Sequence, residues 1–268
     1  TARLEQGRLD DAVASYRRAL EIDPRFAVAH YNLGNTLKYL GRVDDGVASL
    51  RRALEIDPGD AKTERSLLSA LLNVPGLSAQ DLFDEHLSIA ANQTANIVAI
   101  DVPFANDAAV GRRLRVGYLS SDFRSHSVGT NLFPLLSAHD RTQFEVFCYA
   151  DVLRPDAMTE RFRSCADHWR TIAGQTDSQV ARMIRADAID VLVCLAGRFD
   201  RNRPLVCAYR AAPVQVSLFD GATSGLEEMD YWLTDDYLNP PDTPEKFTEE
   251  LYRLPVFYQY PPTDDAPA

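Results

Sequence analysis

Hydrophobic residues recur along the chain with two different spacings, one before and one after about residue 111. In the first part, the segment 7–15 recurs nearly unchanged at 41–49 and the segment 17–24 recurs at 51–58, both with a shift of 34 residues. Each copy has helical spacing and ends at a proline, which cannot continue a helix. Residues 27–40 lie between the copies, also at helical spacing, with Gly34 where two helices would cross. The pattern predicts a repeated helical hairpin.

The repeated unit resembles the tetratricopeptide repeat. The residues at the characteristic offsets are Leu33, Gly34, Ala53 and Pro58 and, one period earlier, Ala12, Tyr16, Ala19 and Pro24. A third unit begins at Ala61, but Leu68 stands where the small glycine is expected, so we predict a capping helix over 61–73 and a helical solenoid over 1–73. A solenoid needs roughly three repeats for stability, so we expect further repeats before Thr1.

Most side chains of the repeats are expected to pack helices together. A solenoid of this kind also has a concave face that binds peptides. Asn32 and Asn35 are the candidate acceptor-peptide contacts on that face, because an amide side chain both donates to and accepts from a passing backbone.

Residues 74–111 are predicted to be a helical linker, with a helix from an N-cap at Ser78 to about Asn92 and a turn-rich stretch after it. Short apolar runs follow, and helical segments separate the first four of them. The runs lie at 114–119, 144–149, 189–195, 214–219 and 231–234. This alternation predicts a parallel sheet in a doubly wound, Rossmann-like α/β domain over 112–260, with 261–268 as a linker or tail. The predicted fold class is α followed by α/β.

Sheets of this kind bind ligands beyond the carboxyl ends of their strands. The residues predicted there are Ser120, Ser121, Asp122, Arg124, His126, Asp151, Gly197, Arg198, Asp220, Gly221, Thr223, Ser224, Gly225 and Asp235. His126 is the strongest candidate, because it starts a predicted helix, where unpaired amides favour an anionic or polar ligand. The loop 223–225 is small and hydroxyl-bearing and can approach a ligand closely, although many strand-to-helix turns look the same.

The net charge, the lengths of the apolar runs and the cysteine spacing exclude several classes of function. The 268 residues include 28 basic and 39 acidic side chains, a net charge of −11, which argues against non-specific nucleic-acid binding. No stretch approaches the roughly 18 apolar residues of a membrane span. The four cysteines have no CxxC spacing, so we expect no metal site and no disulfide framework, but reduced thiols in a cytoplasmic protein.

The order of the motifs resembles the O-linked N-acetylglucosamine transferase and SPINDLY family of glycosyltransferases, in its bacterial form. The resemblance is carried by the 34-residue repeats, LRVGYLSSDFRSH at 114–126, FEVFCY at 144–149, AAPVQV at 211–216, MDY at 229–231 and LTD at 233–235. It implies a two-lobed glycosyltransferase of the GT-B type whose repeats hold the acceptor protein. It also implies a catalytic site residue, His126, at the sugar end of the site. The residues implied to bind the donor are Thr223, Ser224 and Gly225, and Asn32 would belong to a row of asparagines on the concave face.

The activity implied is transfer of N-acetylglucosamine from UDP-N-acetylglucosamine, a co-substrate, to serine or threonine hydroxyls of proteins, with no metal or other cofactor. An O-fucosyltransferase that uses GDP-fucose and a catalytically inactive peptide-binding adaptor stay open as alternatives. Two departures from the bacterial pattern favour the adaptor. Gly197-Arg198-Phe199 replaces Gly-His-Thr, and Asp220 places a carboxylate where an uncharged ring stands beside the diphosphate.

The family's second lobe would follow about residue 268, so we expect this chain to be a fragment that is inactive alone. The resemblance also implies that repeats before Thr1 can mediate a homo-oligomer.

Overall fold

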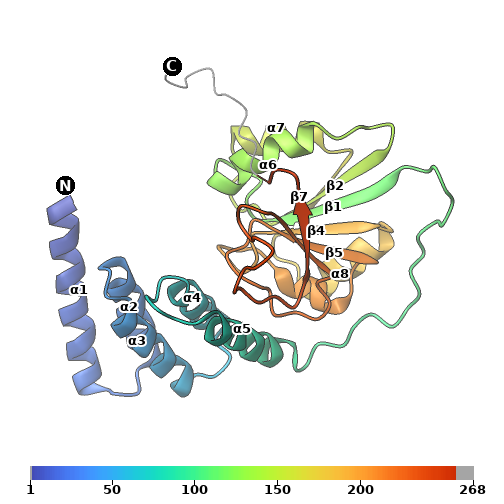
Figure 1. Cartoon of the computed structure of the whole chain (residues 1–268). Coiled ribbons are helices and arrows are strands. Elements are labelled where there is room, and N and C mark those ends of the chain that lie inside the picture. The colour runs from blue at the N-terminus through green and yellow to red at the C-terminus, as the bar shows by residue number, and fades with distance from the viewer. Residues whose placement is uncertain (1, 258–268) are drawn as a thin grey trace. The chain divides into compact units, whose positions relative to one another are not determined.

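The computed structural model describes residues 2–257, with side chains from Gly7 onward, and the chain forms two compact units that divide between Gln93 and Thr94. Figure 1 shows helices alone in the first unit and a sheet with helices in the second. The predicted tail, 261–268, and the last residues of the predicted α/β domain lie outside the described residues.

The first unit is a run of antiparallel helices. They are α1 (Ala2–Ile22), α2 (Ala27–Tyr39), α3 (Val43–Ile56), α4 (Ala61–Leu71) and α5 (Ala79–Thr94). The predicted hairpins and the helices predicted over 61–73 and after Ser78 are confirmed, and the role of 61–73 as a cap stays a prediction. The Ser78 hydroxyl accepts from the Asp81 amide at 3.0 Å as an N-cap. No helix in residues 2–257 is long and apolar enough to cross a membrane.

Two glycines allow α2 and α3 to cross closely. A Cβ built at Gly34 would lie 2.6 Å from the Leu50 Cγ and 2.9 Å from the Gly46 carbonyl oxygen, so a side chain there would force the helices apart. Leu50 is fully buried and packs with Leu67 of α4 and Ile89 of α5 in one hydrophobic cluster. The predicted role of Gly34 at a helix crossing is therefore confirmed.

The second unit is built on a seven-stranded sheet in which all neighbours pair in parallel. The strands are β1 (Leu114–Ser120), β2 (Phe144–Ala150), β3 (His168–Thr171), β4 (Val191–Leu195), β5 (Val214–Leu218), β6 (Tyr231–Asp235) and β7 (Glu250–Leu254). Their order across the sheet is β3-β2-β1-β4-β5-β6-β7. The five predicted apolar runs are strands, and β3 and β7 extend the sheet at its two edges.

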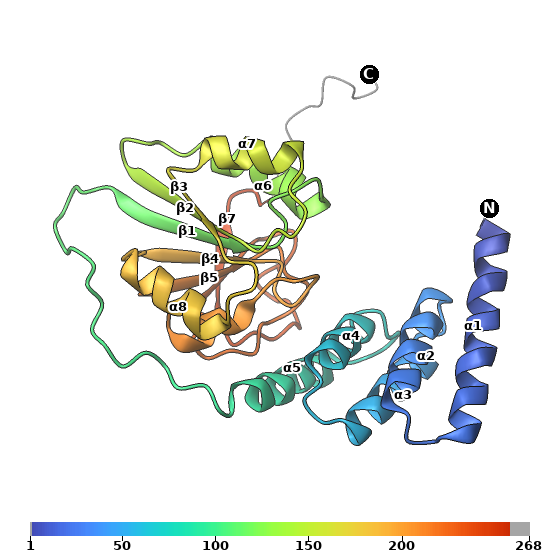
Figure 2. The same cartoon turned by 180° about the vertical axis from the view of Figure 1, so that it is seen from behind.

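Helices cover both faces of this sheet. Figures 1 and 2 show α6 (Ser127–Ser137) and α7 (Ala157–Cys165) on one face and α8 (Asp177–Ala186) on the other. Phe123, Leu132 and Phe162 are fully buried between the first two helices and the sheet. The short helix η1 (Pro204–Tyr209) follows β4. The predicted doubly wound α/β fold is confirmed.

The segment 94–111, which we predicted as part of a linker, belongs to the second unit and is hydrogen-bonded to it. The Ile100 amide donates to the Tyr209 carbonyl at 3.0 Å, and the Arg185 guanidinium donates to the Ile100 carbonyl at 2.8 Å. Further on, the Asn106 amide donates to the Asp190 carboxylate at 2.7 Å. These bonds hold the chain as it enters β1.

Candidate functional site

The loops that follow β1 and β4 meet at the carboxyl edge of the sheet. β2 lies on one side of β1 and β4 on the other, so the strand order reverses here, and doubly wound sheets bind ligands at this point. Residues 121–126 lead from β1 into α6, and residues 196–203 lead from β4 into η1. The sequence-predicted His126 is the last residue of the first loop.

Asn202 joins the two loops. Its Oδ1 accepts from the Ser120 hydroxyl at 2.9 Å and from the Ser121 amide at 2.8 Å, and its Nδ2 donates to the Asp122 Oδ2 at 2.7 Å. Asn202 is 5% exposed and Asp122 1%. Burial of a carboxylate is costly unless it is hydrogen-bonded, so the amide of Asn202 stabilises Asp122 in its buried position.

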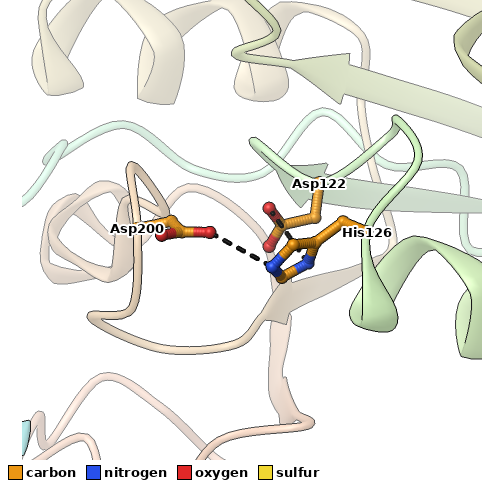
Figure 3. Close-up of side chains that lie close together, drawn as sticks. All are labelled: Asp122, His126 and Asp200. Atoms are coloured by element: carbon orange, nitrogen blue, oxygen red, sulfur yellow. Dashed lines mark ion pairs between the residues drawn. The ribbon is translucent and has the colours of Figure 1, made fainter. Parts of the chain in front are cut away.

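His126 is held between two carboxylates (Figure 3). Its Nδ1 lies 3.5 Å from the Asp122 Oδ1, and its Nε2 lies 3.3 Å from the Asp200 Oδ2. His126 is also the N-cap of α6, because Nδ1 accepts from the Val128 amide at 3.3 Å. In the neutral ring this bond leaves the proton on Nε2, where it faces Asp200. The imidazole is 30% exposed, so it remains accessible to a substrate.

A glycine lets α6 pack against the loop that carries these residues. A Cβ at Gly129 would lie 2.4 Å from the Arg124 carbonyl oxygen and 2.5 Å from the Asp122 carbonyl oxygen. Both neighbours are backbone atoms, so any side chain at this position would displace the loop. Gly129 therefore helps to set where His126 begins the helix.

Asp122, His126 and Asp200 each offer a ligand atom within 4.8 Å of the other two, a spacing that a metal ion requires. The Arg124 guanidinium lies 3.3 Å from the Asp200 carboxylate and 3.7 Å from the Asp122 carboxylate. Because a cationic side chain already balances these carboxylates, the arrangement favours an ion-paired polar site over a metal centre.

The loop after β4 contains a strained backbone. Ala196 and Asp200 have φ values of 54° and 50°, in the left-handed region that side chains other than glycine rarely adopt. Two ion pairs hold the loop to neighbouring segments. Arg201 pairs with Asp151 at 3.3 Å, and Arg203 pairs with Asp177 at 2.6 Å. Strained residues held in this way are common at binding and catalytic sites.

The predicted donor loop is organised by Glu249. Its carboxylate accepts from the Thr223 hydroxyl at 2.7 Å and from the Ser224 amide at 2.8 Å, and all three residues are at most 5% exposed. The Thr223 hydroxyl also accepts from the Gly225 amide at 3.2 Å. Hydrogen bonds within the protein therefore already satisfy the Thr223 hydroxyl and the Ser224 amide. Gly225 is the most exposed of the three residues predicted to bind the donor. Donor binding by this loop stays a prediction.

Asp220 lies directly over Gly197, beside this loop. A Cβ at Gly197 would be 1.6 Å from the Asp220 Oδ2, so the carboxyl fits only because the facing residue is glycine. Desolvation raises the pKa of Asp220 to about 7, against the lowering effects of the Gly221 amide and the positive charge of Arg198. Nearby Glu249 adds a smaller rise. The carboxylate that we expected to repel a diphosphate is therefore partly neutral near pH 7.

Asn32, Asn35 and Asp235 belong to other elements of the chain. Asn32 and Asn35 are on α2 of the first unit, and the Asn35 amide donates to the Tyr31 carbonyl at 3.1 Å. The Asp235 carboxylate accepts from the backbone amides of Tyr237, Leu238 and Phe257, which lowers its pKa and gives it a structural role in the turn after β6.

Sequence reasoning missed four residues that build the site. Asp200, Asn202, Gly129 and Glu249 each act through a partner that is distant in sequence or through close backbone packing. Spacing along the chain gives no signal for such contacts. Asp200 and Asn202 could have been suspected from their place shortly after a predicted strand.

Comparison with known proteins identifies the relatives of both units. The model of the family described as Glycosyl transferase family 41 matches residues 77–260, and two tetratricopeptide-repeat models match residues 2–41 and 27–60. The chain is 40% identical over 161 residues to an Arabidopsis thaliana protein named probable UDP-N-acetylglucosamine–peptide N-acetylglucosaminyltransferase SPINDLY. It is 34% identical over 148 residues to the UDP-N-acetylglucosamine–peptide N-acetylglucosaminyltransferase of Caenorhabditis elegans.

The chain spans only part of these relatives. The alignments cover 58% and 54% of this chain, but 18% of the Arabidopsis protein and 13% of the C. elegans protein. A solved mutant of the O-GlcNAc transferase from Thermobaculum terrenum is similar with a TM-score of 0.85 and 38% identity, over 97% of this chain and 50% of that chain.

Proposed function

The chain belongs to glycosyl transferase family 41, and we propose on this basis that the protein transfers N-acetylglucosamine from UDP-N-acetylglucosamine to serine or threonine hydroxyls of acceptor proteins. The observation that carries the proposal is the family match over 77–260, which includes every strand of the sheet. The names of the relatives in Arabidopsis and C. elegans support the choice of donor.

Transfer is a displacement at the anomeric carbon of the sugar. The acceptor hydroxyl attacks as the bond to the diphosphate breaks, so the site must orient the hydroxyl, take up its proton and stabilise the leaving group. His126 would contact the sugar and acceptor side, because it is accessible and held at the point where the strand order reverses. We propose no metal or other cofactor for this step, and Arg124 supplies positive charge beside His126.

The donor would approach the loop 221–225 through its backbone. The Thr223 hydroxyl and the Ser224 amide both donate to Glu249, which fixes the conformation of the loop. Gly225 is then the residue of the loop that a donor could contact. A neutral Asp220 carboxyl beside this loop would tolerate an anionic diphosphate better than a charged one.

We propose that the repeats bind the acceptor protein, with Asn32 and Asn35 as backbone contacts. The family match to tetratricopeptide repeats over 2–41 and 27–60 supports this role. The described cysteines are free thiols, which supports a reducing compartment such as the cytoplasm. Association of copies through repeats stays a prediction that analytical ultracentrifugation can test.

A transfer assay tests the proposed function. The whole natural protein is incubated with a peptide rich in serine and threonine and with UDP-N-acetylglucosamine or GDP-fucose, and the peptide is analysed by mass spectrometry. We expect addition of an N-acetylhexosamine and a loss of roughly 100-fold in rate for His126→Ala. His168→Ala is the matched control, because His168 begins β3 and pairs with Glu145 away from the site.

The other outcomes select the alternatives. Addition of a deoxyhexose from GDP-fucose would identify an O-fucosyltransferase. Peptide binding without transfer or donor hydrolysis would identify an inactive adaptor. Arg198 and Asp220 favour this alternative, because both depart from the sequence pattern of the bacterial relatives. Full activity of His126→Ala would remove His126 from the site.

A further inference from the structure

Asn202 lies in the loop after β4 and contacts Asp122, the buried carboxylate that faces His126. Its backbone amide donates to the Phe199 carbonyl at 3.0 Å. Its neighbours Arg201 and Arg203 pair with Asp151, which follows β2, and with Asp177, which begins α8. The side-chain amide is therefore delivered to a fixed position beside Asp122.

The chemistry of an amide is needed at this position. The Oδ1 of Asn202 accepts two bonds from Ser120 and Ser121 while its Nδ2 donates to Asp122. A carboxylate can accept but not donate, and an apolar side chain can do neither. Asparagine satisfies all three partners, and Asn202 and these partners are each at most 5% exposed.

The bond from Asn202 fixes the orientation of the Asp122 carboxylate. With Oδ2 bound by the amide at 2.7 Å, the other oxygen, Oδ1, faces the His126 Nδ1 at 3.5 Å. In the neutral ring Nδ1 accepts from the Val128 amide, so Asp122 acts on the charged ring, in which Nδ1 carries a proton that Oδ1 can accept. The buried carboxylate then stabilises the imidazolium and holds it in place. The opposite nitrogen, Nε2, then faces Asp200 and the accessible side.

We propose that Asn202 is a positioning residue, which orients His126 for the transfer step by holding Asp122. This role rests on the proposed function, since His126 is the residue expected to contact the sugar and acceptor. Asn202 is buried, so we expect its loss to slow the step that follows binding and to leave substrate affinity largely intact.

The test compares Asn202→Asp with Thr234→Val in the whole natural protein. Asn202→Asp keeps the size of the side chain and the acceptor for Ser120 and Ser121, but it sets a carboxylate against Asp122. Thr234→Val removes a buried hydrogen bond to Asn239 at β6, outside the site, and so controls for a general loss of stability.

We expect Asn202→Asp to lower kcat by about 10-fold or more with KM for both substrates within a few-fold, as for other residues that orient a catalytic side chain. Thr234→Val should keep the wild-type kcat. We also expect diethyl pyrocarbonate to modify His126 several-fold faster in Asn202→Asp than in wild type, as measured on the His126 peptide by mass spectrometry, and unchanged in Thr234→Val.

Equal kcat in wild type and Asn202→Asp, or an unchanged rate of His126 modification, would overturn the positioning role. An increase in KM with kcat preserved would overturn it as well, because it would place Asn202 in binding. Failure of the proposed function has a different signature, namely a wild-type protein without transfer. In that case the modification rate of His126 still decides whether Asn202 controls the ring.

Discussion

A glycine creates the space that Asp220 occupies at the carboxyl edge of the sheet. The carboxyl lies where a side chain at residue 197 would be, 1.6 Å from the Cβ position of that residue. Desolvation of the carboxyl at this place disfavours its charged form, so the pKa rises from 3.8 to about 7. A side chain that reads as a permanent negative charge in the sequence thus titrates near neutral pH in the folded chain.

The raised pKa makes stability depend on pH in a direction opposite to that of an ion-paired aspartate. Between about pH 4 and pH 7 the folded state holds the Asp220 proton and the unfolded state does not, so the free energy of unfolding falls as pH rises. At about 1.4 kcal/mol per pKa unit, the loss is at most about 4 kcal/mol. We expect Asp220→Asn to abolish this dependence and to be more stable than wild type above pH 7.

Urea denaturation near pH 5 and near pH 8, followed by tryptophan fluorescence, measures this effect. Trp169 and Trp232 are the two tryptophans of the chain and both lie in the α/β unit, so the signal reports on the unit that contains Asp220. An equal pH slope in wild type and Asp220→Asn would contradict the raised pKa.

Gly129 is a second position where a missing side chain shapes the site. In Gly129→Ala the new methyl would meet the Arg124 and Asp122 carbonyl oxygens, at 2.4 and 2.5 Å. The helix gains about 1 kcal/mol from alanine, whereas overpacking against backbone costs about 1–3 kcal/mol. We expect a net loss of stability in the fluorescence-detected transition and a lower transfer rate, because the loop that carries His126 must move.

Ser137→Ala is the control for this prediction. Ser137 is an exposed residue at the end of the same helix, and its hydroxyl donates to the Pro134 carbonyl at 3.0 Å. The substitution should change stability and transfer little. Normal transfer by Gly129→Ala would show that the loop accommodates a methyl group without displacing His126.

At the scale of elements, the sequence predicted the central strands and missed the edges. The runs that became β1, β2, β4 and β5 are continuous and apolar because both faces of a central parallel strand are covered. The edge strands read HWRT in β3 and ELYRL in β7, with no fully buried position, so their hydrophobic pattern is weak. Their pairing with β2 and β6 becomes visible only in the fold.

The candidate site was likewise predictable only in part, at the residues that follow central strands. His126 and the loop 223–225 follow central strands, so topology alone brings them to one edge of the sheet. Glu249 and Asn202 reach the same region from 24 and 76 positions further along the chain than Gly225 and His126, which no periodicity reveals. The contacts that fix the geometry are therefore those that the sequence pattern could not supply.

Glu249 connects two elements, the loop after β5 and the start of β7. Its removal in Glu249→Ala leaves the Ser224 amide and the Thr223 hydroxyl buried without their acceptor, at a cost of about 1–3 kcal/mol. We expect this loss of stability together with weaker binding of the nucleotide sugar, because the loop 223–225 is no longer held. Isothermal titration calorimetry and urea denaturation measure the two effects.

Glu227→Ala is the matched control, because Glu227 is an exposed carboxylate that follows the same loop. It should bind the donor like wild type. A Glu249→Ala protein that loses stability but binds the donor normally would show that the loop 223–225 does not contact the nucleotide sugar.

At the scale of the whole molecule, the chain joins two units that rest on different sources of stability. The repeat unit buries a narrow seam between neighbouring helices, around Leu50, Leu67 and Ile89. The α/β unit buries both faces of a sheet, with Phe123, Leu132 and Phe162 on one of them. Because each unit has its own hydrophobic core, we expect a substitution inside one core to change the unfolding of that unit alone.

Gly34→Ala tests this independence. The methyl group would lie 2.6 Å from the Leu50 Cγ and 2.9 Å from the Gly46 carbonyl oxygen, so α2 and α3 must separate, at a cost of about 1–3 kcal/mol that exceeds the gain in helix propensity. We expect the helical signal in far-ultraviolet circular dichroism to lose part of its amplitude at a lower temperature, while the tryptophan transition of the α/β unit stays in place. Gly7→Ala, where a Cβ meets no atom within 4 Å, should leave both transitions unchanged or raise the first slightly. If Gly34→Ala shifted both transitions together, the two units would unfold as one cooperative body, and the repeats would then contribute to the stability of the α/β unit.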